Sequence, residues 1–179
     1  MVAEAARVSA GAGGVLWAPY LMGERTPHLD TNARAALVGL AASHHRGHII
    51  RAVLEGVAFS LRETLTIFEE LNVPISSIRL GGGGARSALW RQIQADVYGR
   101  AVETVLVDEG AAFGAAVLAG IGAGVWRDAD EASDRLVGRA VAASPDPDTV
   151  LIMNERYAAY RRLYPALRTL HPQTSFVSN

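Results

Sequence analysis

The sequence predicts an α/β fold in which short strands alternate with helices, and three observations support this prediction. Short apolar runs bounded by glycine, proline or asparagine recur along the chain, as is typical of strands. Longer segments repeat apolar residues at three- and four-residue steps, the pattern of amphipathic helices. Half of the 179 residues are hydrophobic and a fifth are charged, which suits a domain that buries a core. Together these features indicate layers of helix and sheet.

The first half of the chain contains two predicted strands and the longest predicted helix. Residues 1–12 are small and polar, without the apolar core of a signal peptide, and we expect them to be disordered. Apolar runs predict strands over residues 15–20 and 36–40, and residues 21–34 between them should form a loop. The helix predicted over residues 43–71 carries an apolar stripe made of Ile50, Val53, Leu54, Val57, Leu61, Leu65 and Phe68.

The second half begins with a predicted strand over residues 77–80 that runs directly into four glycines. Ser87 is a suitable N-cap for the next helix, which should end at Gly99. The apolar face expected for that helix consists of Leu89, Trp90, Ile93 and Val97. The remaining predicted elements are a strand over residues 102–107, helices over residues 110–122 and 128–137, a turn at Pro145 and Pro147, and a final helix over residues 150–170.

The composition excludes several kinds of chemistry. All 17 basic residues are arginine, so this sequence has no Walker A motif, no protein-kinase catalytic lysine and no lysine for a pyridoxal phosphate Schiff base. It also has no cysteine, which excludes disulfides, zinc fingers and thiol catalysis and fits a reducing cytoplasm. The formal net charge of -1 indicates neither a nucleic acid nor an anionic membrane as partner.

The most membrane-like stretch is residues 110–126. It is rich in alanine and glycine, and it falls short of the roughly 20 strongly apolar residues that a membrane-spanning helix needs. We therefore expect a buried helix of a soluble protein here, with Gly110 and Gly114 allowing neighbouring elements to approach closely.

The glycine run, Gly81–Gly84 followed by Ala85, is the strongest local signal for a binding site. Glycine adopts positive φ without strain and lets a ligand approach the backbone closely. The helix that begins near Ser87 presents unpaired N–H groups and the positive end of its dipole, which together attract phosphate. The spacing is not the G-x-G-x-x-G of dinucleotide-binding folds. Taken alone, it leaves two interpretations open, a nucleotide or phosphate site and a structural tight turn.

Other polar residues have one structural and one functional interpretation each. His44 and His48 have the spacing of a metal-binding pair, but the glutamate of an H-E-x-x-H motif is missing, which favours a solvated cluster in the first helical turn. Arg25 either faces a phosphate or pairs locally with Glu24. Glu55 is either an exposed helix residue or a carboxylate that binds a ribose hydroxyl.

Four ordered motifs resemble one known family. The loop Gly23–Pro27 (GERTP) resembles a loop of the FGGY carbohydrate kinases, and of their xylulokinase branch in particular. Residues 35–55 (AALVGLAASHHRGHIIRAVLE) are similar to that family's long C-terminal signature. Residues 80–102 resemble its adenosine motif with the following helix, and residues 109–120 resemble the next helix. The resemblance covers nearly the whole chain.

The resemblance implies a ribonuclease H-like, actin-like ATPase fold. Residues 1–179 would be part of the C-terminal, nucleotide-binding domain, without that domain's first strands. In the intact kinase it implies ATP as the phosphoryl donor, Mg²⁺ as cofactor, and a sugar bound mainly by a separate N-terminal domain. The residues expected to bind the nucleotide are Gly82, Gly83, Gly84, Ala85 and Ser87, with Arg25 as a further candidate.

The activity implied for the intact protein is the phosphorylation of D-xylulose to D-xylulose 5-phosphate in the cytoplasm. The family's catalytic-base aspartate follows a glycine-rich segment, and no aspartate in this sequence does. We therefore expect no catalytic residue and no metal ligand in the chain, and we expect the chain alone to be inactive. The alternatives are a non-catalytic remnant, a nucleotide-binding module, and an FGGY kinase for gluconate, ribulose or glycerol. The resemblance also implies that the sheet's first strands are missing, which would leave a strand edge unpaired and apolar helix faces uncovered, and we therefore expect the chain to be less stable than its size suggests and to self-associate.

Overall fold

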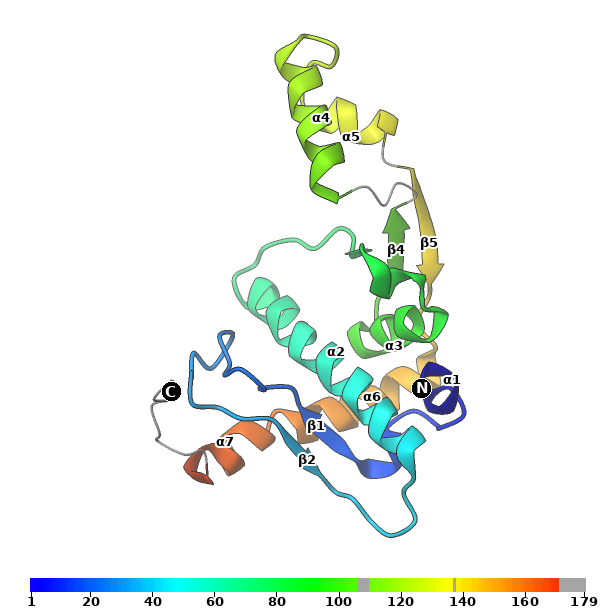
Figure 1. Cartoon of the computed structure of the whole chain (residues 1–179), viewed down its shortest axis with the longest axis vertical. Helices are drawn as coiled ribbons and strands as arrows, with labels where there is room; N and C mark the ends of the chain where they lie inside the picture. The colour runs from blue at the N-terminus through cyan, green and yellow to red at the C-terminus, as the bar shows by residue number, and fades with distance from the viewer. Residues whose placement is uncertain (106–109, 137, 171–179) are drawn as a thin grey trace, which may run out of the picture.

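In the computed structural model, described over residues 1–105, 110–136 and 138–170, one long helix organises the body of the molecule. This helix, α2 (Arg46–Glu70), packs against a two-stranded sheet and the helix α3 (Ala88–Tyr98), and the helix α6 (Pro147–Tyr160) runs behind it and also contacts the sheet (Figure 1). Its N-cap is His45, two residues after the predicted start. The predicted helix is therefore confirmed, with slightly shorter bounds.

The first sheet is an antiparallel pair formed by β1 (Leu16–Ala18) and β2 (Ala36–Val38). Both strands were predicted from their apolar runs, and both are shorter than the runs. The residues between them form a loop that bridges back on itself where Glu24 pairs with Asp30. This loop carries the GERTP motif.

The second sheet has the strand order β3-β4-β5. β3 (Arg79–Leu80) is parallel to β4 (Val102–Val105), and α3 connects them. β5 (Arg139–Ala143) pairs antiparallel with β4 and was not predicted. Its sequence is mostly alanine, which has low strand propensity, so only its pairing with β4 makes it a strand. Residues 106–107 of the predicted strand lie outside the described residues.

The core lies where β1, α2, α3 and α6 meet. Its largest fully buried side chains include Phe59, Ile93 and Met153. The buried cluster consists of Ala18, Tyr20, Ala33, Ala58, Phe59, Ile93, Val97, Met153, Tyr157, Tyr160 and Leu163. Of the four apolar residues predicted to face inward from α3, Ile93 and Val97 are fully buried, and Leu89 and Trp90 are partly buried against the cluster. The core thus holds α3, and the loop that precedes it, against α2.

The prediction that residues 1–12 are disordered is wrong for the described structure. They include the helix α1 (Val2–Ala5), and Ala5 and Ala12 are both 0% exposed. Backbone groups of this segment bind side chains of α2: Val8 O accepts from Arg51, and Gly11 N donates to Glu55. These long-range partners explain the order, because the local sequence has no pattern that would predict it.

The buried face of α2 also differs from the predicted apolar stripe. The buried residues of this helix are Gly47, Arg51, Ala52, Glu55, Gly56, Ala58, Phe59 and Glu63, whereas Leu61 and Phe68 are 45% and 42% exposed. A glycine faces inward at position 56 because β1 lies very close to the helix there. A Cβ added to Gly56 would overlap the backbone oxygen of Trp17.

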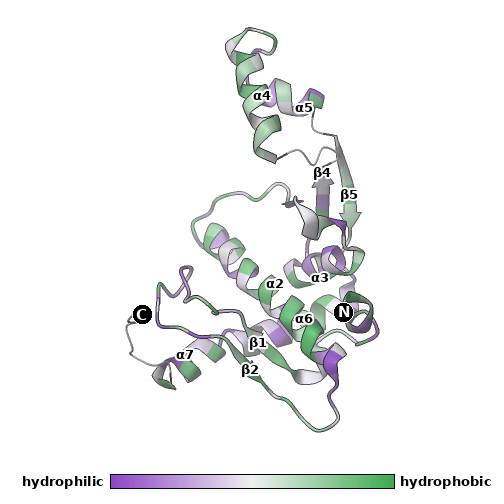
Figure 2. Ribbon diagram, viewed as in Figure 1, coloured by the Kyte–Doolittle hydropathy of each residue, from purple (hydrophilic) through white to green (hydrophobic). Residues whose placement is uncertain are grey.

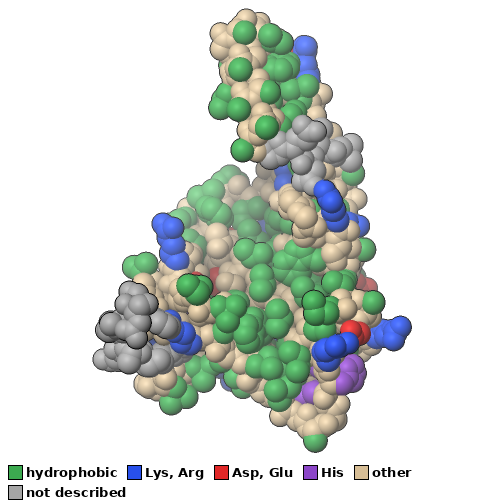
Figure 3. Space-filling view, in the orientation of Figure 1, with side chains coloured by type: hydrophobic (Ala, Val, Ile, Leu, Met, Phe, Trp, Pro, Cys, Tyr) green, Lys and Arg blue, Asp and Glu red, His purple; other side chains and the backbone are tan. Residues whose placement is uncertain are grey.

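The helices α4 (Gly110–Gly122) and α5 (Ala129–Leu136) form an arm that projects from the body (Figure 1). Their predicted existence is confirmed, but the expectation that α4 is buried is wrong. No side chain described for α4 is buried, an added Cβ at Gly114 would meet nothing within 4 Å, and α4 packs mainly against α5. Figure 2 shows that the exposed helix is hydrophobic, and Figure 3 shows apolar side chains spread over it.

The final predicted helix is broken into three pieces. These are α6, α7 (Leu163–Leu167) and a 3₁₀ turn, η3 (Arg168–Leu170). The break follows from Pro165, which has no N–H to donate to the carbonyl of Arg161 and whose ring disfavours a continuous helix. Among the described residues, no helix is both long enough and apolar enough to cross a bilayer.

Candidate functional site

The glycine loop lies at the carboxyl ends of the two parallel strands. A cavity of about 270 Å³ opens there, lined by Leu80, Gly81, Gly82, Ala85, Arg86, Arg91, Thr104 and Val105. In open α/β sheets, ligands bind at the carboxyl ends of the strands, where loops leave a crevice. The cavity therefore joins the end of β3, the end of β4 and the start of α3.

Gly82 gives the loop its shape. Its backbone has φ 70° and ψ -174°, a region that only glycine occupies readily. The 3₁₀ turn η2 (Gly83–Arg86) follows directly, with Ala85 N bonded to Gly82 O at 3.1 Å. The glycine at position 82 is thus required by the backbone itself, whatever the loop binds.

The space around the glycine loop is open at its first three glycines and filled at the fourth. A Cβ added to Gly81, Gly82 or Gly83 would meet no heavy atom within 4 Å. A Cβ at Gly84 would lie 3.3 Å from the indole ring of Trp90. The loop therefore rests on α3 at Gly84 and leaves the backbone of the preceding glycines accessible to a ligand.

Ser87 caps α3 as the sequence predicted. Its Oγ accepts a hydrogen bond from Trp90 N at 3.3 Å, and its backbone N donates to Gly84 O at 3.1 Å. At the other end, Gly99 closes the helix with φ 63°. The cap orients the positive end of the α3 dipole towards the glycine loop.

The charged residues that line the cavity are both arginines. Arg91 donates from its terminal nitrogen to Ala85 O at 2.7 Å, and Arg86 lies in the loop itself. No carboxylate is found among the described lining residues. A cavity with two guanidinium groups, a helix N-terminus and open glycine backbone suits an anionic ligand such as a phosphate ester.

The structure brings five of the six predicted nucleotide-binding residues together. Gly82 and Ala85 line the cavity, and Gly83, Gly84 and Ser87 belong to the same loop and cap. Arg25 is not among the described lining residues; it is exposed on the loop between β1 and β2. Arg91, Thr104 and Val105 were not singled out, although an arginine in the first turn after a glycine loop was a usable signal.

Neither interpretation of Glu55 is correct. It is 2% exposed, its carboxylate lies 2.6 Å from Nε of Arg51, and it accepts from Gly11 N at 3.0 Å. Burial raises the pKa of Glu55, and the hydrogen bond and charge of Arg51 oppose that rise. Glu55 therefore anchors the N-terminal segment.

Three histidines form hydrogen bonds at the N-terminus of α2. His45 and His48 form a reciprocal capping box, and His44 bonds the backbone at Ala41 N and Gly13 O. Burial and the neighbouring imidazoles lower the pKa of His48. Within the described residues, no group of three or more histidine, aspartate or glutamate side chains has metal-binding geometry.

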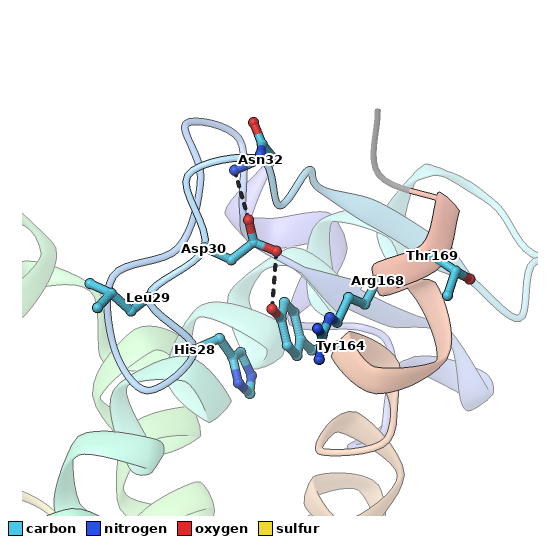
Figure 4. Close-up of a pocket in the computed structure, with 7 residues that line it drawn as sticks. All are labelled: His28, Leu29, Asp30, Asn32, Tyr164, Arg168 and Thr169. Atoms are coloured by element: carbon cyan, nitrogen blue, oxygen red, sulfur yellow. Dashed lines mark hydrogen bonds between the residues drawn. The ribbon is translucent and has the colours of Figure 1, made fainter. Parts of the chain in front are cut away.

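A second cavity, of about 430 Å³, lies between residues 28–32, which follow the GERTP motif, and the α7–η3 segment (Figure 4). The ring of His28 stacks on Tyr164 with centroids 3.7 Å apart, and the hydroxyl of Tyr164 donates to Asp30 at 3.0 Å. Burial and the Asp30 contact raise the pKa of Tyr164. Sequence reasoning missed this pair, because 134 residues separate Tyr164 from Asp30.

The comparisons with known proteins decide the family. The model of the C-terminal domain of the FGGY family of carbohydrate kinases matches residues 1–123. This chain belongs to the FGGY carbohydrate kinases. The matched range includes the GERTP loop, the glycine loop and α3, so the motifs of the first two-thirds of the chain are FGGY motifs. The fold is accordingly the actin-like ATPase fold of this family, represented by its C-terminal domain.

Individual relatives of the chain support the same family assignment. The chain is 35% identical to a xylulose kinase of Bacillus subtilis over 90% of its own length and 32% of that protein. The crystal structure of xylulose kinase from Rhodospirillum rubrum superposes with a TM-score of 0.83 at 34% identity, covering 94% of this chain and 34% of that one. Glycerol kinase from Plasmodium falciparum, crystallised with ADP, superposes with a TM-score of 0.68 at 26% identity. The match covers 85% of this chain and 31% of that one. The chain thus spans about a third of the length of these relatives.

Proposed function

We propose that this chain is the nucleotide-binding part of an ATP-dependent xylulose kinase, and that the glycine loop is its ATP and ADP site. The observation that carries the proposal is the cavity at Gly81–Ala85, with its open backbone, two arginines and no carboxylate among its described lining residues. The relatives support the choice of sugar, since xylulose kinases are prominent among them.

In this proposal the residues of the chain bind and orient the nucleotide. The backbone of Gly82 and Gly83 lies against the adenosine and α-phosphate, and the α3 N-terminus capped by Ser87 favours the negative charge. ATP supplies the γ-phosphoryl group that is transferred to a sugar hydroxyl. The described lining residues include no carboxylate that could ligate Mg²⁺, and we derive no step through that ion.

Phosphoryl transfer by the intact protein needs a general base and a bound sugar in addition to the nucleotide. We assign neither to the described residues, and we propose that the 179-residue chain by itself does not turn over D-xylulose. Turnover that depends on D-xylulose in a coupled assay of the pure chain would contradict this part of the proposal. A similar fold in a glycerol kinase makes glycerol the second acceptor to test in the same assay.

Calorimetric titration with ADP tests the nucleotide site. Gly83 has open space around it, and its φ lies outside the positive range, so Gly83→Val adds bulk where the ligand would lie without straining the backbone. We expect the wild type to bind ADP and Gly83→Val to lose measurable binding. Gly114→Val is the matched control, because Gly114 is equally open and lies on α4 rather than in the loop, and it should bind like the wild type. Wild type that does not bind ADP, or Gly83→Val that binds it equally, contradicts the proposal.

A further inference from the structure

Arg91 lies beside the glycine loop and is bonded to it. It lies on the first turn of α3, one residue after Trp90, and its guanidinium reaches back to the carbonyl of Ala85 at 2.7 Å. This is the one hydrogen bond that the described structure gives this side chain, and none of the described acidic residues forms an ion pair with it. Its Nε is buried and has no hydrogen-bond partner among the described residues.

The bond to Ala85 matters because the loop has few other attachments. An added Cβ at Gly81, Gly82 or Gly83 would meet nothing, and the N–H groups of Ala85 and Ser87 bond to carbonyls of the loop itself, Gly82 O and Gly84 O. Besides the capping bonds at Ser87, which accepts from Trp90 N and Arg91 N, the loop is held against α3 by the Trp90 contact at Gly84 and the Arg91 bond at Ala85. Without Arg91 the turn would keep its local bonds and lose its fixed position over the cavity.

The guanidinium of Arg91 also carries a positive charge that no described carboxylate neutralises. A half-buried guanidinium without a carboxylate is costly unless an anion compensates it, and an unpaired buried donor adds to that cost. The side chain also lines the cavity, so a ligand there lies within the field of a charge that no described carboxylate compensates. A phosphate group would supply the missing counter-charge, whereas a neutral nucleoside would not.

We propose that Arg91 is a positioning residue for the nucleotide site, and that it gives the site its preference for phosphorylated ligands. It fixes Ala85 so that the glycine backbone keeps its binding geometry, and its charge favours ADP and AMP over adenosine. This inference rests on the proposed function for the location of the ligand. The positioning role rests on the Arg91–Ala85 bond alone, and it can be tested separately.

The test compares the wild type with Arg91→Gln, Arg91→Lys and the control Arg127→Gln. Arg127 is exposed in the turn before α5, where it pairs with Asp128 and lies away from the loop. Calorimetry with ADP, AMP and adenosine measures the preference for phosphate. Amide hydrogen exchange over residues 82–87 measures the position of the loop, and thermal unfolding of each variant shows that it folds.

We expect Arg91→Gln to weaken ADP and AMP binding about 10- to 100-fold, the usual effect of losing a charged hydrogen bond, with a smaller effect on adenosine. Arg91→Lys should recover the preference for phosphate but not the full affinity, because lysine lacks the planar fork of arginine. Both variants should speed exchange in the loop and leave the midpoint of thermal unfolding nearly unchanged.

Unchanged ADP affinity in Arg91→Gln, or an equal loss for all three ligands, overturns the charge role. Unchanged exchange over residues 82–87 overturns the positioning role. If the wild type binds no ADP, the proposed function fails together with the charge role, and the exchange measurement still decides whether Arg91 positions the loop. An exchange increase spread over the whole chain, with a lower unfolding midpoint, would instead show that Arg91 serves only general stability.

Discussion

Glu55 shows how one buried carboxylate organises a whole segment. It receives a hydrogen bond from Gly11 and pairs with Arg51, which in turn donates to Val8. Burying both charges removes them from water, and their attraction offsets that cost only partly. The raised pKa of Glu55 shows that burial outweighs the pairing. The pair therefore serves mainly to attach the N-terminal segment to α2.

A pH dependence of stability follows from this pKa. Because the folded pKa of Glu55 lies above its ordinary value of 4.5, folding favours the protonated carboxyl. Its contribution to stability is fully present below that ordinary value and is lost as the pH rises through the folded pKa. We expect the wild type to lose stability relative to Glu55→Gln as the pH rises from 4 to 7. Urea unfolding of both proteins across this range measures the difference, and a constant gap between them would contradict the prediction.

The close contact of α2 with β1 depends on a glycine within the helix. Gly56 faces the backbone of Trp17, and the core residues Ala52 and Phe59 lie one turn away on the same side. Glycine lowers the intrinsic stability of a helix interior, so its presence there reflects the space that β1 requires. Packing of the strand thus decides which face of α2 is buried.

Replacing this glycine should destabilise the protein. Gly56→Ala places a methyl group where the Trp17 backbone lies, and overpacking of this kind costs about 1–3 kcal/mol. Gly114→Ala on α4 is the matched control, since its space is open, and it should stabilise by up to about 1 kcal/mol through helix propensity. Urea unfolding reports both values. Equal effects of the two substitutions would show that the helix–strand contact is not tight.

The molecule as a whole consists of a packed body and an apolar arm. In the body, β1, α2, α3 and α6 share one buried cluster. On the arm, Leu118 is 69% exposed and nearby Val125 is 63% exposed, and further apolar side chains are exposed along the second half of α2. Exposed apolar area of this kind favours association, because burying it stabilises a complex by roughly 25 cal/mol per Å².

We therefore expect the isolated chain to self-associate through the arm. Leu118→Glu should weaken the association about 10- to 100-fold, the value of burying one leucine side chain. The control Leu151→Glu on α6, where Leu151 is 66% exposed on the body, should leave it unchanged. Size-exclusion chromatography with light scattering over a range of concentrations gives the mass. A wild type that stays monomeric at all concentrations, or equal effects of the two variants, would contradict the prediction.

Local patterns were enough to predict most elements and the location of the glycine loop. The Ser87 cap, the Gly99 end of α3 and the strand before the glycines depend on neighbours within a few residues, so the sequence shows them directly. The resemblance of four motifs to FGGY kinases was also readable without a structure, and the family comparison confirms it.

Contacts between distant residues decided the rest. The order of residues 1–12 depends on Arg51 and Glu55, about forty positions later. The buried face of α2 depends on β1, and the strand β5 depends on pairing with β4. Such contacts form only when the chain is packed, since neither hydrophobic periodicity nor local propensity encodes which surfaces will meet.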